Sequence, residues 1–370
     1  HRDLHSFPTR RSSDLVVLSQ HIGDLETAAA LSAFRRVVHD LQGLFGVEPA
    51  QTMADLHPDY VSTKEAKRWV KHPTGVQHHH AHILSCMAEN ELEGPVLGIA
   101  WDGTGYGLDG MVWGGEFLVV KGVGYDRLAT LRPFRLPGGE RAVREPRRSA
   151  AGLLFAAYGP GAFERRDLPT MAAFSPAEMR AVREALERPF NAPLTTAAGR
   201  LFDAVASLLG LRQRAGFEGQ AAMALEALAM GSSDCGAYSL SLQPAGGGAD
   251  PGEGGMRVAA RDAFWHADWG PMLDELLADA RAGAPPDRMA ARFHRGLIDL
   301  MIAVAARAGL ERVAVSGGCF QNVLLLEGAI EGLRAAGHRV YWHQRVPTND
   351  GGLALGQAVV GIRACSEGMR

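Results

Sequence analysis

The sequence lacks several features that would place it in a specialised class of protein. Its four cysteines stand far apart and form no C-x-x-C pair, which argues against a disulfide framework or a zinc ribbon and for a reducing, cytoplasmic environment: Cys86, Cys235, Cys319 and Cys365. No run reaches the roughly 18 apolar residues of a membrane span. A net charge of −3 provides no basic field for nucleic acid. We therefore expect neither a membrane nor a nucleic-acid partner.

The composition is that of an ordinary globular protein. The chain has 370 residues, of which 46% are hydrophobic and 21% charged, enough for one large core or two ordinary ones. Residues 1–15 are basic and polar, without the apolar region of a signal peptide. We expect them to be a sequence artefact or a disordered tail, in place of the true start of the first lobe. The globular pattern begins at Val16.

A histidine cluster, Val76-Gln-His-His-His-Ala-His-Ile, is the most informative segment. If Thr74 caps a helix in a T-x-x-Q capping box, His78 and His82 lie one turn apart on the same face and can bind one metal ion. His79 and His80 then point elsewhere and serve as packing or supporting groups. The alternatives are a tag, a solvated face or an accidental cluster. A zincin motif is excluded because no glutamate follows the first histidine.

A carboxylate follows the next expected strand, residues 96–101. After Asp102, glycines at 103, 105, 107 and 110 lead into an apolar segment that ends at Val120, which predicts a β-hairpin around a glycine loop. Pro137-Gly-Gly marks a boundary, and helices are expected to dominate from 150 to about 229. The glycine-rich stretch 244–255 is expected to be a flexible loop.

The last part of the chain predicts a βαβα unit. Strands are expected at 312–316 and 339–343, each followed by a helix. Because ligands collect at the carboxyl ends of such strands, Ser316-Gly-Gly-Cys-Phe-Gln-Asn and Pro347-Thr-Asn-Asp-Gly should border one crevice. Gly317 and Gly318 form either a nucleotide loop or a plain turn, and Asp350 either binds metal or caps the final helix.

Together these residues form a candidate metal site. His78, His82, Asp102 and Asp350 would supply two nitrogens and up to two carboxylates, which suits iron, zinc or manganese better than a calcium cage. Asp203 lies in an apolar helical segment, where it is either a surface acid or a ligand group. Arginines in the stretch 141–148 face either a ligand, a further domain or solvent.

Nine motifs along the chain resemble one known family. SQHIGDL, DLHPDY, VQHHHAH, DGTGYG with WGGEF, PGG with REP, GRLFDAVASLLG, FEGQAAMALEALA, VSGGCFQN and PTNDGGLALGQA occur in order from Val16. They are similar to the carboxy-terminal, TsaD-like domain of the HypF carbamoyltransferases of [NiFe]-hydrogenase maturation. The resemblance implies an α/β, bilobed, actin-like ATPase (ASKHA) fold around a nucleotide and metal cleft. Its first lobe would span 16–140, truncated at its start, and its second 141–370.

The resemblance also implies residue roles. His78, His82 and Asp350 would bind iron or zinc, with Asp102 on metal or ligand and Mg²⁺ as a further candidate ion. The ATP or AMP moiety of carbamoyl adenylate would be held at its phosphates by Ala100, Trp101, Gly103 and Thr104. The ribose would meet Asp203. The nucleoside would be flanked by Gly216, Glu218 and Gly219, and by Gly317, Gly318 and Asn322 on the adenine side.

The reaction that the resemblance implies is carbamoyl transfer from carbamoyl adenylate to the carboxy-terminal cysteine of HypE, a step toward the cyanide ligand. The family's acylphosphatase-like, zinc-module and adenylating domains have no counterpart in this sequence, so the ATP- and carbamoyl-phosphate-dependent first stage is expected elsewhere. The alternatives are a related carbamoyltransferase for tRNA or a small molecule, and an inactive fragment that only binds nucleotide or HypE. Cys319 is expected to pack beside the glycine turn, not to act as a nucleophile.

Overall fold

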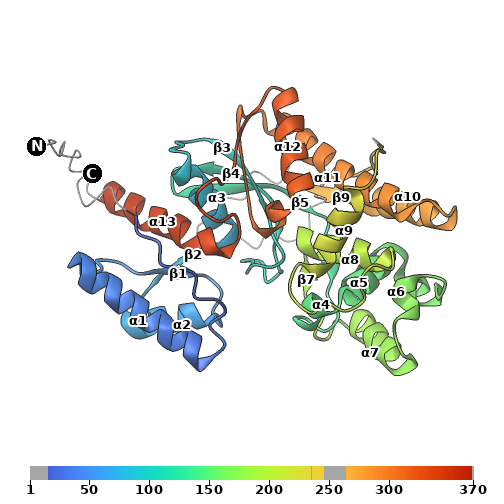
Figure 1. The fold of residues 1–370 in the computed structure, drawn as a ribbon, viewed down its shortest axis with the longest axis horizontal. Coiled ribbons are helices and arrows are strands. Elements are labelled where there is room, and N and C mark those ends of the chain that lie inside the picture. The colour runs from blue at the N-terminus through green and yellow to red at the C-terminus, as the bar shows by residue number, and fades with distance from the viewer. Residues whose placement is uncertain (1–15, 235, 246–263, 369–370) are drawn as a thin grey trace, which may run out of the picture.

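The amino-terminal part of the fold is a small α/β unit. The computed structural model describes residues 16–234, 236–245 and 264–368, so the expectation for residues 1–15 lies outside the described residues. The unit consists of α1 (Ala28–Phe45), β1 (Met53–Asp55), α2 (Val61–Trp69) and β2 (Thr74–Val76), with β1 and β2 parallel and Asp55 opposite Val76. Helix α1 begins after Thr27, whose side-chain oxygen accepts a hydrogen bond from the Ala30 amide. Figure 1 shows this unit beneath α13.

A seven-stranded mixed sheet forms the centre of the molecule. Its order is β11-β10-β3-β4-β5-β9-β8. The strands are β3 (Val96–Trp101), β4 (Gly115–Lys121), β5 (Gly124–Leu131), β8 (Ser241–Pro244), β9 (Trp265–Asp268), β10 (Arg312–Ser316) and β11 (Arg339–Tyr341). β3 and β4 pair antiparallel around residues 102–114, which confirms the predicted hairpin, and β10 runs parallel to both β3 and β11. The α/β class is therefore confirmed.

Helices cover both faces of this sheet, as the alternation along β3 requires. Val96 and Ala100 belong to the core beneath α3 (His78–Glu89), whereas Leu97, Ile99 and Trp101 belong to the larger core on the opposite face. Helix α3 lies very close to the sheet, since a Cβ added at Gly98 would meet the Ile83 side chain at 2.5 Å. This close approach places the amino end of α3 at the carboxyl end of β3.

The middle of the chain is mainly helical, as predicted. It comprises β6 (Phe134–Arg135), α4 (Arg141–Arg144), α5 (Pro146–Tyr158), η2 (Gly159–Glu164), α6 (Pro169–Ala172), α7 (Pro176–Glu187), β7 (Leu194–Thr195), α8 (Ala198–Leu208) and α9 (Gln220–Ala229). Helix α8 is buried along almost its whole length and packs on α5 and α9. Residue 244 ends β8, and residues 246–255 of the expected flexible loop lie outside the described residues.

The carboxy-terminal part contains the predicted βαβα unit. Its helices are α10 (Gly270–Arg281), α11 (Pro286–Ala308), η4 (Gly318–Gln321), α12 (Val323–Ala335), η5 (Asp350–Gly352) and α13 (Leu353–Gly368). β11 ends two residues before the predicted end at His343, because the chain there turns toward Glu89 of α3. α13 returns to pack on α3 (Figure 1). The stretches on either side of residue 140 thus share one sheet.

None of the helices among the described residues is both long enough and apolar enough to span a bilayer.

Candidate metal centre and nucleotide side

Helix α3 presents the two predicted histidine ligands. It begins at His78, and its amino-terminal cap is Gln77, whose side-chain oxygen accepts a hydrogen bond from the His80 amide at 2.8 Å. The predicted capping box with Thr74 is wrong, because residues 74–76 are extended and pair with β1 as β2. His78 and His82 keep their one-turn spacing, and both side chains are about 1% exposed.

The structure brings all four predicted metal ligands together. His78, His82, Asp102 and Asp350 each offer one donor atom, and these atoms lie within 4.8 Å of one another. His82 Nε2 is 2.9 Å from Asp102 Oδ2 and 3.6 Å from Asp350 Oδ1. His78 Nε2 lies 3.6 Å from each of the same two oxygens. The ligands come from α3, from the end of β3 and from η5, so three separate segments must meet to form the site.

This arrangement fits a metal ion by geometry and by chemistry. Donors bound to one tetrahedral ion at about 2.0–2.2 Å lie roughly 3.3–3.6 Å apart. Nε2 of His78, Nε2 of His82 and Oδ2 of Asp102 are buried without a hydrogen-bond partner among the described residues. Buried polar atoms are rarely left unpaired, so these atoms are explained if they bind a ligand. Two imidazoles and two carboxylates suit iron, zinc or manganese.

The carboxylates and the histidines of the site shift one another's pKa values. Burial by itself would lower the pKa of His78 and of His82, but the neighbouring carboxylates raise both above the usual histidine value. Burial would likewise raise the pKa of Asp102, yet the two histidines hold it well below its usual value. The carboxylates thus favour positive charge at this position, and any metal ion would compete with protons for the two nitrogens.

Asp55 is a fifth side chain of the candidate site, which the sequence interpretation missed. Its Oδ2 lies 2.9 Å from His78 Nδ1, and its side chain is 5% exposed. A carboxylate on the remote nitrogen fixes the ring so that Nε2 faces the metal position. Asp55 is the last residue of β1 and the first of the DLHPDY motif. An acid at the end of a strand was the available signal, but only the β1 and β2 pairing shows which histidine it contacts.

His79 and His80 support the helix instead of joining the donor set, as predicted. His79 Nδ1 is 3.2 Å from Gln77 Nε2, and the His80 ring packs against Tyr125 with centroids 4.6 Å apart. Burial lowers the pKa of His80 to about 4 and also lowers that of His79. Both rings are therefore neutral at physiological pH.

The glycine loop after β3 is held by a buried charge network. Arg127 donates from Nε to Glu116 at 2.6 Å and from Nη1 to Asp109 at 3.0 Å. Asp109 in turn accepts from Trp113 Nε1 at 2.8 Å, and the Arg127 guanidinium lies 3.9 Å from the centroid of the Trp113 ring. At the other end, a Cβ at Gly105 would meet the His79 ring at 2.3 Å. The loop that follows Asp102 is thus fixed at Gly105 and at Asp109.

The glycine pair after β10 lets a second backbone approach Asp102. Gly317 has a φ of 108°, and a Cβ there would lie 2.2 Å from the Trp101 carbonyl oxygen. A Cβ at Gly318 would lie 2.9 Å from Asp102 Oδ1. Cys319 beside them is half-buried, and burial together with Asp102 raises the pKa of its thiol well above the usual value. A thiol of that kind is a poor nucleophile, in agreement with the predicted packing role.

Asp203 lies in α8 as a buried acid, not on a polar stripe. Its Oδ2 is 3.2 Å from Arg200 Nη1, but neither atom has a hydrogen-bond partner among the described residues. Burial raises the pKa of Asp203 to about 6 despite Arg200. A Cβ at Gly103 would meet Arg200 Nη2 at 3.1 Å and Glu218 Oε1 at 3.2 Å, so these groups adjoin the glycine loop. They are available for the polar edge of a ligand.

The other predicted ligand-binding residues differ in how far they are buried. Ala100 and Trp101 are buried in β3, whereas Thr104, Gly216 and Glu218 are exposed. Gly219 begins α9 with a left-handed backbone. Asn322 is buried, and both ends of its amide have partners: Leu325 N donates to Oδ1 at 2.8 Å, and His294 Nε2 is 3.0 Å from Nδ2. Asn322 therefore supports the start of α12 from within.

Two arginines of the basic stretch 141–148 have a structural role, which none of the three predicted alternatives included. Arg147 and Arg148 are buried and both donate to Glu145, and Arg147 also donates to Glu178 at 2.7 Å. Arg141 is exposed and pairs with the other oxygen of Glu145. Arg147 thus connects α5 with α7.

Comparisons with known proteins were consistent along the chain. Residues 4–89 match a family model described as the HypF Kae1-like domain. Residues 98–357 match one described as the second subdomain of the Kae1-like domain of carbamoyltransferases. The carbamoyltransferase HypF of Synechocystis sp. is 38% identical over 94% of this chain but only 44% of its own length. The carbamoyltransferase HypF homolog of Cupriavidus necator is 39% identical over 92% of this chain and 85% of its own length.

Solved structures give the same result. A full-length HypF in a phosphate- and nucleotide-bound form superposes with a TM-score of 0.82 at 35% identity, over 93% of this chain and 51% of the other. HypF from T. kodakarensis superposes with a TM-score of 0.80 at 28% identity, over 94% of this chain and 45% of the other. The present chain thus spans about half the length of these HypF proteins.

Proposed function

This chain belongs to the HypF carbamoyltransferase family, and from that premise we propose that it passes a carbamoyl group from carbamoyl adenylate to the carboxy-terminal cysteine thiol of HypE. The observation that carries the proposal is the convergence of His78, His82, Asp102 and Asp350 beside two glycine loops. This arrangement suits a phosphate-bearing ligand held next to a cation.

The balance of the reaction is simple. The thiol sulfur forms a bond to the carbamoyl carbon, the bond from that carbon to the phosphate oxygen breaks, and AMP leaves with the electron pair while the thiol proton passes to solvent. No enzyme nucleophile is required, which agrees with the raised pKa of the Cys319 thiol. A bound iron or zinc ion would supply a Lewis acid to the phosphoryl or carbonyl oxygen.

The residues of this chain have separate tasks in that reaction. The two histidines and two aspartates would hold the ion, and Asp55 orients His78 toward it. Gly103, Gly317 and Gly318 let the two glycine loops approach Asp102 closely, because a side chain at these positions would collide with neighbouring protein groups. Within the described part of the chain, Asp203 and Arg200 have polar atoms without a hydrogen-bond partner, which suit ribose hydroxyls. A maturation role in [NiFe]-hydrogenase assembly follows from the identity of the acceptor.

A transfer assay tests the proposal. Purified protein is supplied with Fe²⁺ or Zn²⁺, HypE, and carbamoyl adenylate made by a separate adenylating domain from ATP and carbamoyl phosphate. Mass spectrometry of HypE should show the gain of one carbamoyl group on its last cysteine. The His82→Ala variant should lose metal binding and transfer, whereas His72→Ala, which removes an exposed histidine, should retain both.

Three outcomes would contradict the proposal. Bound metal without any transfer to HypE would favour a domain that only binds nucleotide or HypE. Transfer to tRNA or to a small molecule, with HypE unmodified, would favour a related carbamoyltransferase. Equal transfer by wild type and His82→Ala would remove the metal centre from the reaction.

A further inference from the structure

A hydrogen-bonded chain of three buried side chains starts at Glu89, at the far end of α3 from the two histidines His78 and His82. Glu89 is the last residue of α3, Ser316 the last of β10, and His343 follows β11. His343 Nδ1 lies 2.8 Å from Glu89 Oε2, and His343 Nε2 lies 2.9 Å from Ser316 Oγ. The Glu89 and His343 side chains are each 3% exposed, and Ser316 is fully buried.

The chemistry of the chain assigns its protons. A carboxylate can only accept hydrogen bonds, so Nδ1 of His343 carries the hydrogen and donates it to Glu89. Nε2 of His343 then has no hydrogen and accepts a hydrogen bond from the Ser316 hydroxyl. Burial would raise the pKa of Glu89, but the backbone amides of Gln344 and Arg345 and the His343 ring lower it. Burial lowers the pKa of His343, against the opposing effect of Glu89. The ring is neutral and the carboxylate charged.

The order Ser, His, Glu is that of a hydrolytic triad, but the surroundings exclude a nucleophile. Ser316 has no exposed surface and faces the α3 side of the sheet, so no substrate can reach its hydroxyl. The contacts instead hold the segment 342–349, which leads from β11 to Asp350. Glu89 Oε1 accepts from the Gln344 amide at 2.9 Å and from the Arg345 amide at 2.5 Å.

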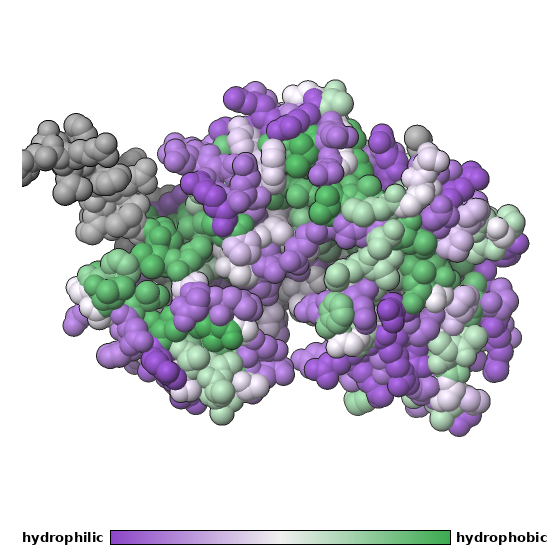
Figure 2. All heavy atoms as spheres, viewed as in Figure 1, coloured by the Kyte–Doolittle hydropathy of each residue, from purple (hydrophilic) through white to green (hydrophobic). Residues whose placement is uncertain are grey.

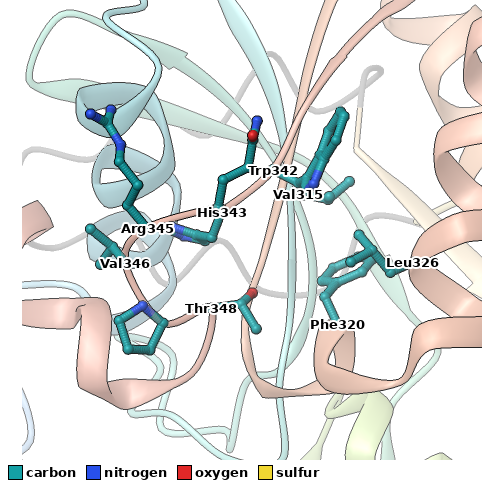
Figure 3. A pocket seen from close by; sticks show the side chains of 10 residues that line it. Val315, Phe320, Leu326, Trp342, His343, Arg345, Val346 and Thr348 are labelled. Carbon is teal, nitrogen blue, oxygen red and sulfur yellow. The ribbon is translucent and has the colours of Figure 1, made fainter.

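The same segment is attached to the glycine turn at its other end. The Gly317 amide donates to the Thr348 carbonyl oxygen at 3.0 Å, and Thr348 Oγ1 donates to the Gly317 carbonyl oxygen at 3.2 Å. On its outer side the segment borders a cavity of about 380 Å³. Figure 3 shows Arg345 and Val346 on one side of this cavity and Phe320 and Leu326 on the other. Trp342 packs under the Arg334 guanidinium, but residues 343–348 border the cavity, so the inner contacts help to fix their position.

Asp350 needs such support more than the other three donors. Its side chain is 65% exposed, whereas those of His78 and His82 are about 1% exposed and that of Asp102 is 13% exposed. Packing around the side chain cannot fix it, so its carboxylate is placed by its backbone. We propose that Glu89, His343 and Ser316 are positioning residues that hold the Asp350 segment against α3 and so complete the metal centre, an inference that rests on the proposed function.

A double-mutant cycle that measures Co²⁺ binding tests the positioning role of these residues. Co²⁺ is titrated into metal-free protein, and its dissociation constant and visible spectrum are measured for wild type, Glu89→Gln, Asp350→Ala and the double variant. Glu89→Gln should weaken Co²⁺ binding about 10–100-fold, as is usual for residues that orient ligands. In the Asp350→Ala background it should change affinity less than about 3-fold, because the group it positions is gone. Glu93→Gln, on an exposed acid nearby, is the matched control.

His343→Asn keeps the proposal testable if Glu89→Gln folds poorly. The asparagine amide nitrogen can take the place of Nδ1, so this variant should bind Co²⁺ more tightly than His343→Ala and show a spectrum closer to wild type. Equal weakening by Glu89→Gln in both backgrounds, or none in either, would overturn the positioning role while leaving the metal centre intact. Equal Co²⁺ affinity of wild type and His82→Ala would instead overturn the metal centre itself.

Discussion

Helices α1 and α3 lie in the same half of the chain, yet they differ in almost every respect. Among the described residues, α1 has no buried residue, whereas α3 is buried along nearly its entire length. Leu44 and Phe45 at the end of α1 are exposed, and Figure 2 shows apolar residues at the surface of this part of the molecule. α3 lies between the sheet and α13 and carries four histidines.

The difference shows what a functional helix requires. The sequence of α1 is amphipathic and strongly helical, so local preferences are sufficient to explain it. α3 has four histidines in its first turns, which are mediocre helix formers, and its burial comes from tertiary packing. A given substitution should therefore have opposite effects in the two places.

The largest effect is expected where α13 crosses α3. A Cβ at Gly356 would lie 1.8 Å from the Ala81 carbonyl oxygen, a backbone atom that cannot move unless the two helices separate. We expect Gly356→Ala to destabilise the protein by about 3 kcal/mol in urea unfolding and to weaken Co²⁺ binding, because Asp350 lies just before α13. An unchanged midpoint would show that the contact between α3 and α13 is loose.

The second prediction concerns pH and metal binding. The pKa values of His78 and His82 are raised in the folded state, so their protonation stabilises the metal-free protein. This stabilisation is fully present below about pH 6.5, the pKa of an unfolded histidine, and is lost as pH rises through the folded-state pKa. Metal needs the same nitrogens unprotonated, so its affinity should rise up to about tenfold per pH unit for each histidine that still holds a proton. The increase in Tm caused by Co²⁺ should thus be larger at about pH 8 than at about pH 6. A pH-independent increase would exclude these histidines as ligands.

The third prediction extends the comparison to α8, another buried helix. The pKa of Asp203 is raised to about 6, so its charge costs stability above that pH, and the cost disappears as pH falls below the unfolded value of about 3.9. Asp203→Asn should therefore raise stability by about 1–3 kcal/mol near neutral pH and by little at about pH 4. The same variant should bind AMP more weakly.

Calorimetric Tm values at the two pH values, together with AMP titrations, separate these effects. A loss of stability at neutral pH would mean that the ion pair with Arg200 outweighs the burial of the charge. Unchanged AMP affinity would remove Asp203 from the nucleotide side.

The smallest effect is expected in α1. Gly43 is exposed in a helix, and a Cβ there would meet nothing within 4 Å. Gly43→Ala should stabilise the protein by about 0.5–1 kcal/mol, the helix preference of alanine over glycine, with no change in Co²⁺ affinity. This variant is the matched control for Gly356→Ala. If both variants destabilised the protein, tighter packing of α3 against α13 would not explain the effect of Gly356→Ala.

Local sequence patterns determined the α/β class, the hairpin around residues 102–114, the βαβα unit and the spacing of His78 and His82. These features depend on periodicity, turn residues and neighbours along the chain, which a sequence displays directly. The positions of Asp102 and Asp350 after expected strands, together with their residue type, also grouped them with those histidines, and the structure brings the four side chains together. The family of the chain is confirmed by the comparisons.

Only the tertiary structure decided the rest. The predicted start of α3 was wrong because residues 74–76 pair with β1 as a strand, and the local capping pattern does not reveal this pairing. Three further features join residues that are remote along the chain. They are the contact of Asp55 with His78, the contact of Glu89 with His343, and the single sheet that contains strands from both sides of residue 140. The strength of a hydrogen bond or ion pair depends on distance in space and on burial, and neither quantity is written in the order of the residues.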